Sequence, residues 1–383
     1  MHSRYAELHA LQCYPLSCLN RGQYDEPKTL DFGGTVRAAI SSQCGKRHWR
    51  MELEEELGEP AARTRRVPPR VIAALRQRDW PADLADFAGA QIARSAKHKG
   101  LRTQPQADHL TEAMLYQPTT QLIEDLVALC ETHRASLAAA LTADPKDDPG
   151  ALLPTEQVIA GLLKRTATIN LFGRWIAELD GADVPGAVQA AWSFTTHTSA
   201  PQPDFYTAVE DWPAPGDHGS AHMANTFHTA GVFYRYATVN LTELLHNLEG
   251  NLKATAELLT LFTKAFIMTV PQAKRTSTAP HTVPHLVHYV IRDRRPVSYA
   301  DAFDQPVQAA PRGGYLAPTR RALTDHAAAL DQLIGTRHRI SHGYATLCPE
   351  PLKPLGTRHT SFEELAAACT ASATAPPFGR EPT

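Results

Sequence analysis

Residues 17–50 read SCLNRGQYDEPKTLDFGGTVRAAISSQCGKRHWR, and this stretch decides how the rest of the chain is interpreted. Arg21 and Lys28 lie in a polar segment that ends at Gly33–Gly34. Val36–Ile40 then predicts a short extended segment. The order indicates a polar, cationic loop placed between two strands.

The next segment predicts a helix that begins at Ser41 or Ser42, which suit an N-cap, and runs to about Leu57. Lys46 and Arg47 lie near its start, where cations oppose the helix dipole. Free N–H groups and cations at a helix start are the groups that bind a phosphate. The stretch therefore predicts an anion-binding site.

Composition limits the class of protein. A chain of 383 residues with 43% hydrophobic and 20% charged residues is typical of a globular protein of two or three domains. The net charge of −2 gives no global attraction for nucleic acid, so a polyanion site must be a local patch.

The sequence also predicts what the chain does not carry. It has no apolar run long enough for a membrane span, its first residues lack the layout of a signal peptide, and its six cysteines form no CxxC pair. GxxxxGK[ST], GxSxG and HExxH motifs are missing, which argues against an NTPase, a hydrolase or a metalloprotease. We expect a cytoplasmic protein without membrane contact or cofactor.

The remaining chain alternates between two kinds of pattern. Residues 61–180 show helical periodicity almost throughout, which indicates a helical insertion. The expected elements around it are strands at Tyr5–Tyr14, Gly231–Val239 and His285–Arg292 and helices at Asn240–Leu248, Leu252–Met268 and Ala317–Arg339. This order predicts an α+β fold, a ferredoxin-like (RRM-like) sheet split by the insertion.

A basic run within the insertion allows two interpretations. Arg63, Arg65, Arg66 and Arg70 suit a solvated linker, and the alternative is a second RNA-contact patch.

Several motifs together resemble one known family. They are Ser17–Arg21, Phe32–Gly34, Ile40–Gln43 with Lys46–Arg47, Gly219–His222, Gly231–Ala237, and Val270–Pro271 with Ala273–Lys274. In this order and spacing they resemble the CRISPR-RNA-binding backbone subunit of the type I-E CRISPR Cascade complex. The resemblance covers nearly the whole chain, although the helical insertion and the tail match only in position and character.

The resemblance implies a hand-shaped organisation. Residues 1–60 and 181–345 would form a discontinuous RRM-like palm, residues 61–180 helical fingers, and residues 200–230 a protruding hairpin thumb. Residues 346–383 would be a C-terminal extension. Small residues and prolines in the sequence predict that this extension is disordered from about residue 370. Copies of such a protein would polymerise along one guide RNA and present its spacer to target DNA, with other Cascade subunits as further partners.

The resemblance and the residue chemistry give the candidate RNA contacts. Cations would neutralise phosphates, the helix start would donate hydrogen bonds, and hairpin aromatics would lie beside unstacked bases. The candidates are Arg21, Lys28, Ser41, Ser42, Gln43, Lys46, Arg47, Arg50, Trp175, Phe205, Tyr206, Thr207, Met223, Lys274 and Arg275.

A nuclease site and a metal site are alternatives for which the sequence gives weaker signals than for RNA binding. Asp31 could act as in target-RNA-cleaving relatives of type III complexes, but one aspartate is a weak nuclease signal. The sets His218, His222, His228 and His281, His285, His288 have partly metal-like spacing without a nearby cysteine. We therefore predict a scaffold without catalytic or metal site, with a generic single-stranded-RNA-binding module as the other alternative.

Overall fold

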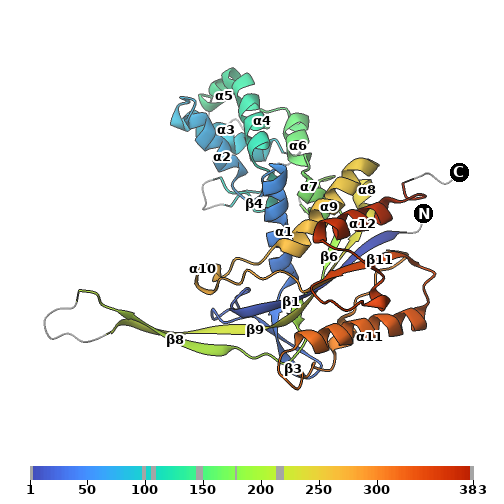
Figure 1. Cartoon of the computed structure of the whole chain (residues 1–383). Coiled ribbons are helices and arrows are strands. Elements are labelled where there is room, and N and C mark those ends of the chain that lie inside the picture. Colours follow the sequence, from blue (N-terminus) through green and yellow to red (C-terminus); the bar gives the residue numbers. More distant parts are fainter. Residues whose placement is uncertain are drawn as a thin grey trace. The chain divides into compact units, whose positions relative to one another are not determined.

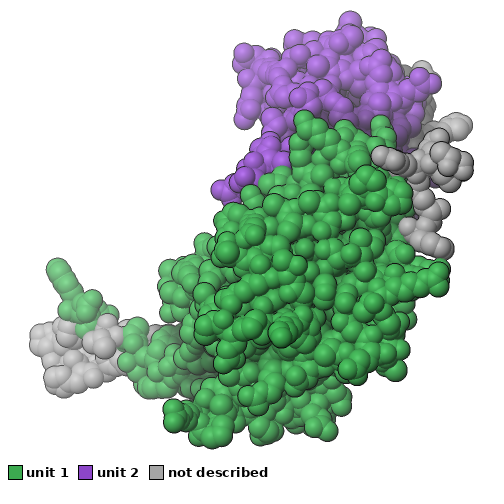
Figure 2. Space-filling view, turned by 45° about the vertical axis from the view of Figure 1, so that its right-hand side comes forward, with its two compact units in different colours: residues 1–53, 187–383 green, residues 54–186 purple. Residues whose placement is uncertain are grey.

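The computed structural model describes residues 3–96, 101–104, 109–143, 150–176, 179–212 and 220–379. The chain divides into two compact units, Met1–Leu53 with Ala187–Thr383, and Glu54–Gly186 (Figure 2). The first boundary falls inside a helix, and residues 346–383 belong to the first unit.

The first unit has an α+β fold that is built on one β-sheet. Within the described residues its strands are β1 Arg4–Ser17, β2 Thr29–Phe32, β3 Thr35–Ile40, β6 Val188–Ala190, β7 Ser193–Thr195, β8 Gln202–Val209, β9 Ser220–Asn240, β10 Leu286–Asp293, β11 Arg339–Thr346 and β12 Thr357–Arg358. The order is β12-β11-β10-β1-β9-β7-β3-β2, with β6 and β8 also paired to β9. Strands β10, β1, β9 and β7 are antiparallel to their neighbours.

Helices cover both sides of this sheet. They are α1 Ser42–Leu57, α8 Leu241–Asn247, α9 Leu252–Met268, α10 Arg275–Thr278, α11 Leu316–Ile334 and α12 Phe362–Thr374, with 3-10 turns η1 Ala300–Phe303 and η2 Lys353–Leu355. Figure 1 shows α9 and α12 on one side of the sheet and α11 on the other. Trp49 of α1 packs edge-on against Phe262 of α9, with ring centroids 5.7 Å apart. Burial of such aromatic surface holds α1 and α9 together.

Most first-unit elements agree with the sequence. The predicted helix at Leu252–Met268 is α9, and its Asn251 side chain caps it. The helix predicted at Asn240–Leu248 is α8, and the Asn240 side chain caps it by accepting a hydrogen bond from the Glu243 N–H. The helix predicted to Arg339 is too long, because α11 ends at Ile334 before Gly335.

The predicted disorder from residue 370 is wrong for residues 370–374, which complete α12. Cys369 and Ala373 are buried in this helix, where it packs on α9 and β11. The Phe378 ring lies 4.9 Å from the Arg4 guanidinium. The small residues of this segment were the reason for the predicted disorder. In the structure, their small size permits α12 to pack closely against α9. Residues 380–383 lie outside the described part of the chain.

Glycine is required at position 33 for a reason other than RNA contact. Gly33 has φ +59°, and a Cβ there would lie 1.6 Å from the Asp304 carbonyl oxygen. The backbone of Gly33 therefore lies close to the backbone of another part of the protein. An L-residue would be strained by both φ and the clash.

The alternation of polar and apolar residues in β1 does not mark a solvent face, because Glu7 and His9 are fully buried. His9 and His288 are partners across β1 and β10, with ring centroids 5.5 Å apart. Burial holds the pKa of both rings well below 6.5, and it lowers the pKa of His342 to about 4. Burial raises the pKa of Glu7 to about 8, although Arg292 at 3.1 Å opposes this.

These groups predict that stability falls as pH falls from 6.5 towards 4. The unfolded chain then gains a proton at each of the three histidines, which stay neutral when folded. Glu7 acts oppositely, since the folded state holds a proton there that the unfolded chain releases, but one proton is outweighed by three. For each proton that the unfolded chain binds in excess of the folded chain, the free energy of unfolding falls by about 1.4 kcal/mol when the pH falls by one unit. Urea denaturation at pH 7 and pH 5 measures this, and equal stability at the two values would contradict neutral buried histidines.

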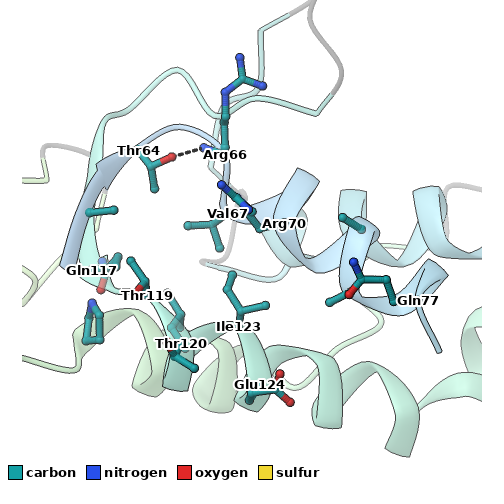
Figure 3. A pocket seen from close by; sticks show the side chains of 15 residues that line it. Thr64, Arg66, Val67, Arg70, Gln77, Gln117, Thr119, Thr120, Ile123 and Glu124 are labelled. Carbon is teal, nitrogen blue, oxygen red and sulfur yellow. Dashed lines mark hydrogen bonds between the residues drawn. The ribbon is translucent and has the colours of Figure 1, made fainter. Parts of the chain in front are cut away.

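The second unit is mainly helical. Its described elements are β4 Ala61–Thr64, α2 Val67–Arg76, α3 Ala82–Arg94, β5 Leu115–Pro118, α4 Thr120–Thr132, α5 Arg134–Leu141, α6 Thr155–Leu163 and α7 Ala167–Phe172. Leu122, Leu126 and Val158 lie in its core, which agrees with the helical periodicity of residues 61–180. The β4–β5 ribbon was not predicted. Of the arginine run, Arg63 lies in β4 and Arg70 in α2 (Figure 3), Arg65 and Arg66 join these two elements, and all four side chains are exposed. No helix of the residues described in either unit is long and apolar enough to cross a membrane.

Candidate nucleic-acid interface

The start of α1 has the predicted cap. Ser41 Oγ accepts a hydrogen bond from the Cys44 N–H at 3.3 Å, and the Ser41 N–H donates to Asn20 Oδ1 at 2.8 Å. Ser41 is buried, so its hydroxyl serves the helix, whereas Gln43 is exposed and Ser42 is half-buried. The first turn holds no acidic residue. The helix start therefore leaves its positive end uncompensated.

The cations of α1 differ in their surroundings. Lys46 Nζ donates to the Val188 carbonyl at 2.9 Å and so ties α1 to β6. Arg47 is exposed, and its Nη1 lies 3.3 Å from Met51 Sδ. Arg50 is half-buried. Arg47 is thus the α1 cation that is best placed to meet an external anion.

His48 is a residue that the sequence analysis missed. Its Nδ1–H donates to the Cys44 carbonyl at 2.8 Å, and its Nε2 accepts from the Gln272 N–H at 3.1 Å. Burial lowers its pKa, and the nearby charges of Arg47 and Arg275 lower it further. The neutral ring therefore fastens the 270–278 segment to α1 and brings Arg47 and Arg275 into one positive region.

Asp25 was also missed, and it joins two predicted cations. Its Oδ1 lies 2.9 Å from Arg21 Nη1, and its Oδ2 lies 2.9 Å from Lys274 Nζ. These two contacts hold the pKa of the Asp25 carboxyl below its usual range. Lys274 Nζ also donates to Thr226 Oγ1 at 2.6 Å, which connects it to β9. Asp25 thus bridges Arg21 and Lys274 through its one carboxylate.

Two hollows of the first unit meet at Asp25. One, of about 480 Å³, lies along Asn20, Arg21 and His48. The other, of about 710 Å³, lies along Lys274 and the hairpin. The loop before β2, the start of α1 and the hairpin therefore border one connected surface with Lys274 and Arg21 at its middle.

Strand β8 and the first part of β9 form a hairpin that extends beyond the sheet (Figure 1). Directly opposite residues of an antiparallel pair share a face, and faces alternate along each strand. One face carries Phe205, Thr207, Met223, Asn225 and Phe227, and the other carries Asp204, Tyr206, Thr226 and His228. Phe205 and Met223 are each 63% exposed, which is unusual for large apolar side chains.

The hairpin candidates therefore divide between two faces. Phe205, Thr207 and Met223 lie together on the apolar face, and Phe227 is an addition that the sequence analysis missed. Tyr206 lies on the other face and lines the hollow beside Lys274. Gly219 of the quoted motif lies outside the described residues.

The other candidates are more scattered. Lys28 Nζ lies 4.8 Å from the Trp192 ring, a cation–π contact. Arg275 is exposed in α10. Trp175 belongs to the second unit, where it is 75% exposed and borders a hollow with Arg63. Its neighbour Arg174 is buried and donates to the Leu163, Lys164 and Ala182 carbonyls, so Arg174 is structural.

The described residues show no group of three or more His, Cys, Asp or Glu side chains that could hold a metal ion. His288 is buried in the sheet, whereas His285 Nε2 lies 3.3 Å from Arg320 Nη1. His218 lies outside the described residues. Asp31 is exposed in β2.

Chains of solved structures and one protein-family model match this chain. A chain of a solved "CRISPR RNA-guided surveillance complex, pre-nicking" is 37% identical, with 96% of this chain and all of that chain covered and a TM-score of 0.89. A chain of a solved "CRISPR RNA-guided surveillance complex" is 32% identical, with 96% and 99% covered and a TM-score of 0.79. No curated protein matches. Residues 6–368 match the family described as CT1975-like protein, and the chain therefore belongs to this family.

Proposed function

We propose that this protein is a guide-RNA-binding subunit of a CRISPR surveillance complex of the Cascade kind. The observation that carries the proposal is the 37% identity, over 96% of the chain, to a chain of a solved RNA-guided surveillance complex. The cationic surface of the first unit supports it, because Arg47, Arg275, Lys274 and Arg21 lie where a backbone could pass. Such a surface holds phosphates and leaves sequence to be read by base pairing.

The finer proposal is a type I-E backbone subunit that polymerises along the guide in the cytoplasm. The order β10-β1-β9-β7, with α1 after β1 and α9 before β10, supports an RRM-like palm, since it matches a β-α-β-β-α-β sheet. The β8–β9 hairpin supports a thumb that reaches a neighbouring copy, and the helical unit supports fingers.

The test is to purify the tagged chain from its host and to identify by mass spectrometry and RNA sequencing what accompanies it. We expect CRISPR RNA and other Cascade subunits in fixed proportions. A generic single-stranded-RNA-binding module would instead carry mixed RNA and no fixed-size assembly.

We further propose that the protein is a scaffold and not a nuclease. Incubation of the assembled complex with complementary RNA and Mg²⁺ is expected to leave the RNA intact. Cuts at regular intervals that vanish in Asp31→Ala would contradict this, because they would assign catalysis to that carboxylate.

The Asp25 contacts predict a variant with increased affinity. Asp25→Ala frees Arg21 and Lys274 for phosphate, so RNA affinity should rise by up to about fivefold, since an exposed ion pair is worth at most about 1 kcal/mol. Fluorescence anisotropy with a labelled single-stranded RNA measures this. Glu257→Ala, which removes a carboxylate 3.8 Å from Lys253 in α9, is the matched control. Reduced affinity in Asp25→Ala would instead mean that Asp25 positions Lys274 for binding.

A further inference from the structure

His48 joins two segments that lie far apart in the sequence. Its ring belongs to α1 and is half-buried. Its Nδ1 lies 2.8 Å from the Cys44 carbonyl oxygen, one helical turn earlier, and its Nε2 lies 3.1 Å from the Gln272 nitrogen. A single side chain therefore connects α1 with the segment 270–278, which carries Arg275.

The two partners of this ring determine its protonation state. A carbonyl oxygen can only accept a hydrogen bond and an amide N–H can only donate one, so Nδ1 carries the hydrogen and Nε2 carries the lone pair. Only the neutral imidazole has this arrangement, because both nitrogens of the charged ring are donors. The bridge between α1 and the segment 270–278 thus exists only while His48 is neutral.

The segment 270–278 depends on such contacts, because its own backbone is locally unfavourable. Lys274 has φ +47°, and Ala279, directly after the segment, has φ +42°. A left-handed backbone is costly for residues that carry a Cβ, so tertiary contacts must hold it. One such contact joins Lys274 Nζ to Asp25 Oδ2 at 2.9 Å. Lys274 thus anchors the middle of the segment, and His48 anchors its start.

The bridge acts against electrostatic repulsion. Burial lowers the pKa of His48, and the charges of Arg47 and Arg275 lower it further, so both guanidinium groups lie near the ring. Both arginines are exposed. Arg21 and Asp25 line the hollow beside the ring, but the Asp25 carboxylate already contacts Arg21. Like charges move apart unless the backbone that carries them is fixed, and the bridge fixes it.

We propose that His48 is a positioning residue for guide binding, whose neutral ring holds Arg275 close to Arg47 so that both meet one stretch of RNA backbone. This inference rests on the proposed guide-binding function. In this arrangement His48 itself carries no charge and needs no contact with RNA. Its loss would weaken binding, because the segment 270–278 would then have to be ordered at the moment when RNA binds.

The experiment measures the affinity of the full chain for a fluorescein-labelled single-stranded RNA by fluorescence anisotropy at pH 7.5. His48→Asn is too short to reach Gln272 and should weaken binding by about fivefold, the factor that one lost hydrogen bond gives. His48→Gln supplies an amide oxygen that can accept from the Gln272 N–H, and should restore the affinity. The matched control is His246→Asn, which alters an exposed histidine of α8 and should leave the affinity unchanged.

A double variant shows whether His48 acts through Arg275. In the background Arg275→Ala, His48→Asn should cause little further loss, because the guanidinium group that the ring positions is already absent. An equal loss in both backgrounds would overturn the proposal. If the intact chain binds RNA and His48→Asn leaves the affinity unchanged, only the role of His48 is contradicted. If the intact chain binds no RNA, the guide-binding function is contradicted as well.

The pH profile separates positioning from direct contact with a phosphate. Protonation of His48 replaces the acceptor at Nε2 by a donor and adds a third cation beside Arg47 and Arg275. The bridge therefore opens as the pH falls through the pKa of the ring, which lies below 6.5. The ratio of the affinity of the intact chain to that of His48→Gln should fall by about fivefold between pH 7.5 and pH 5, with circular dichroism to verify that both stay folded. A ratio that stays constant or rises in acid would overturn the proposal, because the neutral ring would then not be the form that supports binding.

Discussion

Excision of the β8–β9 hairpin is expected to abolish assemblies of several copies while the single chain still folds. Gln202 and His228 are paired across the two strands, so an Asn-Gly turn can join them when residues 203–227 are removed. The rest of β9 keeps its pairing with β1, and the exposed side chains of the hairpin add little to the core. We therefore expect a thermal unfolding transition close to that of the intact chain.

The measurement is electron microscopy and mass photometry of complexes purified with guide RNA. The intact chain should give particles of regular, repeated mass, and the excised chain should give only single copies. Replacing Phe205 and Met223 by Ser within an intact hairpin separates the role of the apolar face from that of hairpin length. Regular assemblies of the excised chain would contradict a thumb that links copies.

Reversal of the charge of Arg47 and Arg275 is expected to remove guide RNA from the purified protein. Both cations lie around His48 and are exposed, so their loss changes the surface without opening the core. Each lost phosphate contact lowers the salt slope of single-stranded binding by about 0.7, and the introduced carboxylates add repulsion. RNA recovery, measured from absorbance and from gel analysis of the eluate, should fall to background.

The pair Lys46 and Arg47 is a less clear test, because Lys46 also holds the Val188 carbonyl. Loss of RNA in a Lys46 variant could follow from a displaced β6. Lys253→Glu is the matched control for the Arg47/Arg275 variant, since Lys253 is exposed on α9. Full RNA recovery in Arg47→Glu/Arg275→Glu would contradict the assignment of this surface to guide binding.

Local sequence was sufficient for the elements whose signals are short-range. The N-caps at Ser41 and Asn240 and the apolar spacing of Leu252–Met268 are read within one or two helical turns. The cations at the start of α1 were likewise visible, because their conflict with the helix dipole is a property of neighbouring residues. Short elements such as the β4–β5 ribbon were missed, since four residues carry little periodic signal.

What the sequence by itself determined, then, is the order of the elements, the caps and the presence of a cationic helix start. Only the tertiary structure decided which polar groups meet. Asp25 reaches Lys274, His48 reaches Gln272, and Glu7 and His9 are buried although β1 alternates. The physical reason is that these contacts join residues hundreds of positions apart, and their energies depend on distance and burial, which a local pattern does not contain.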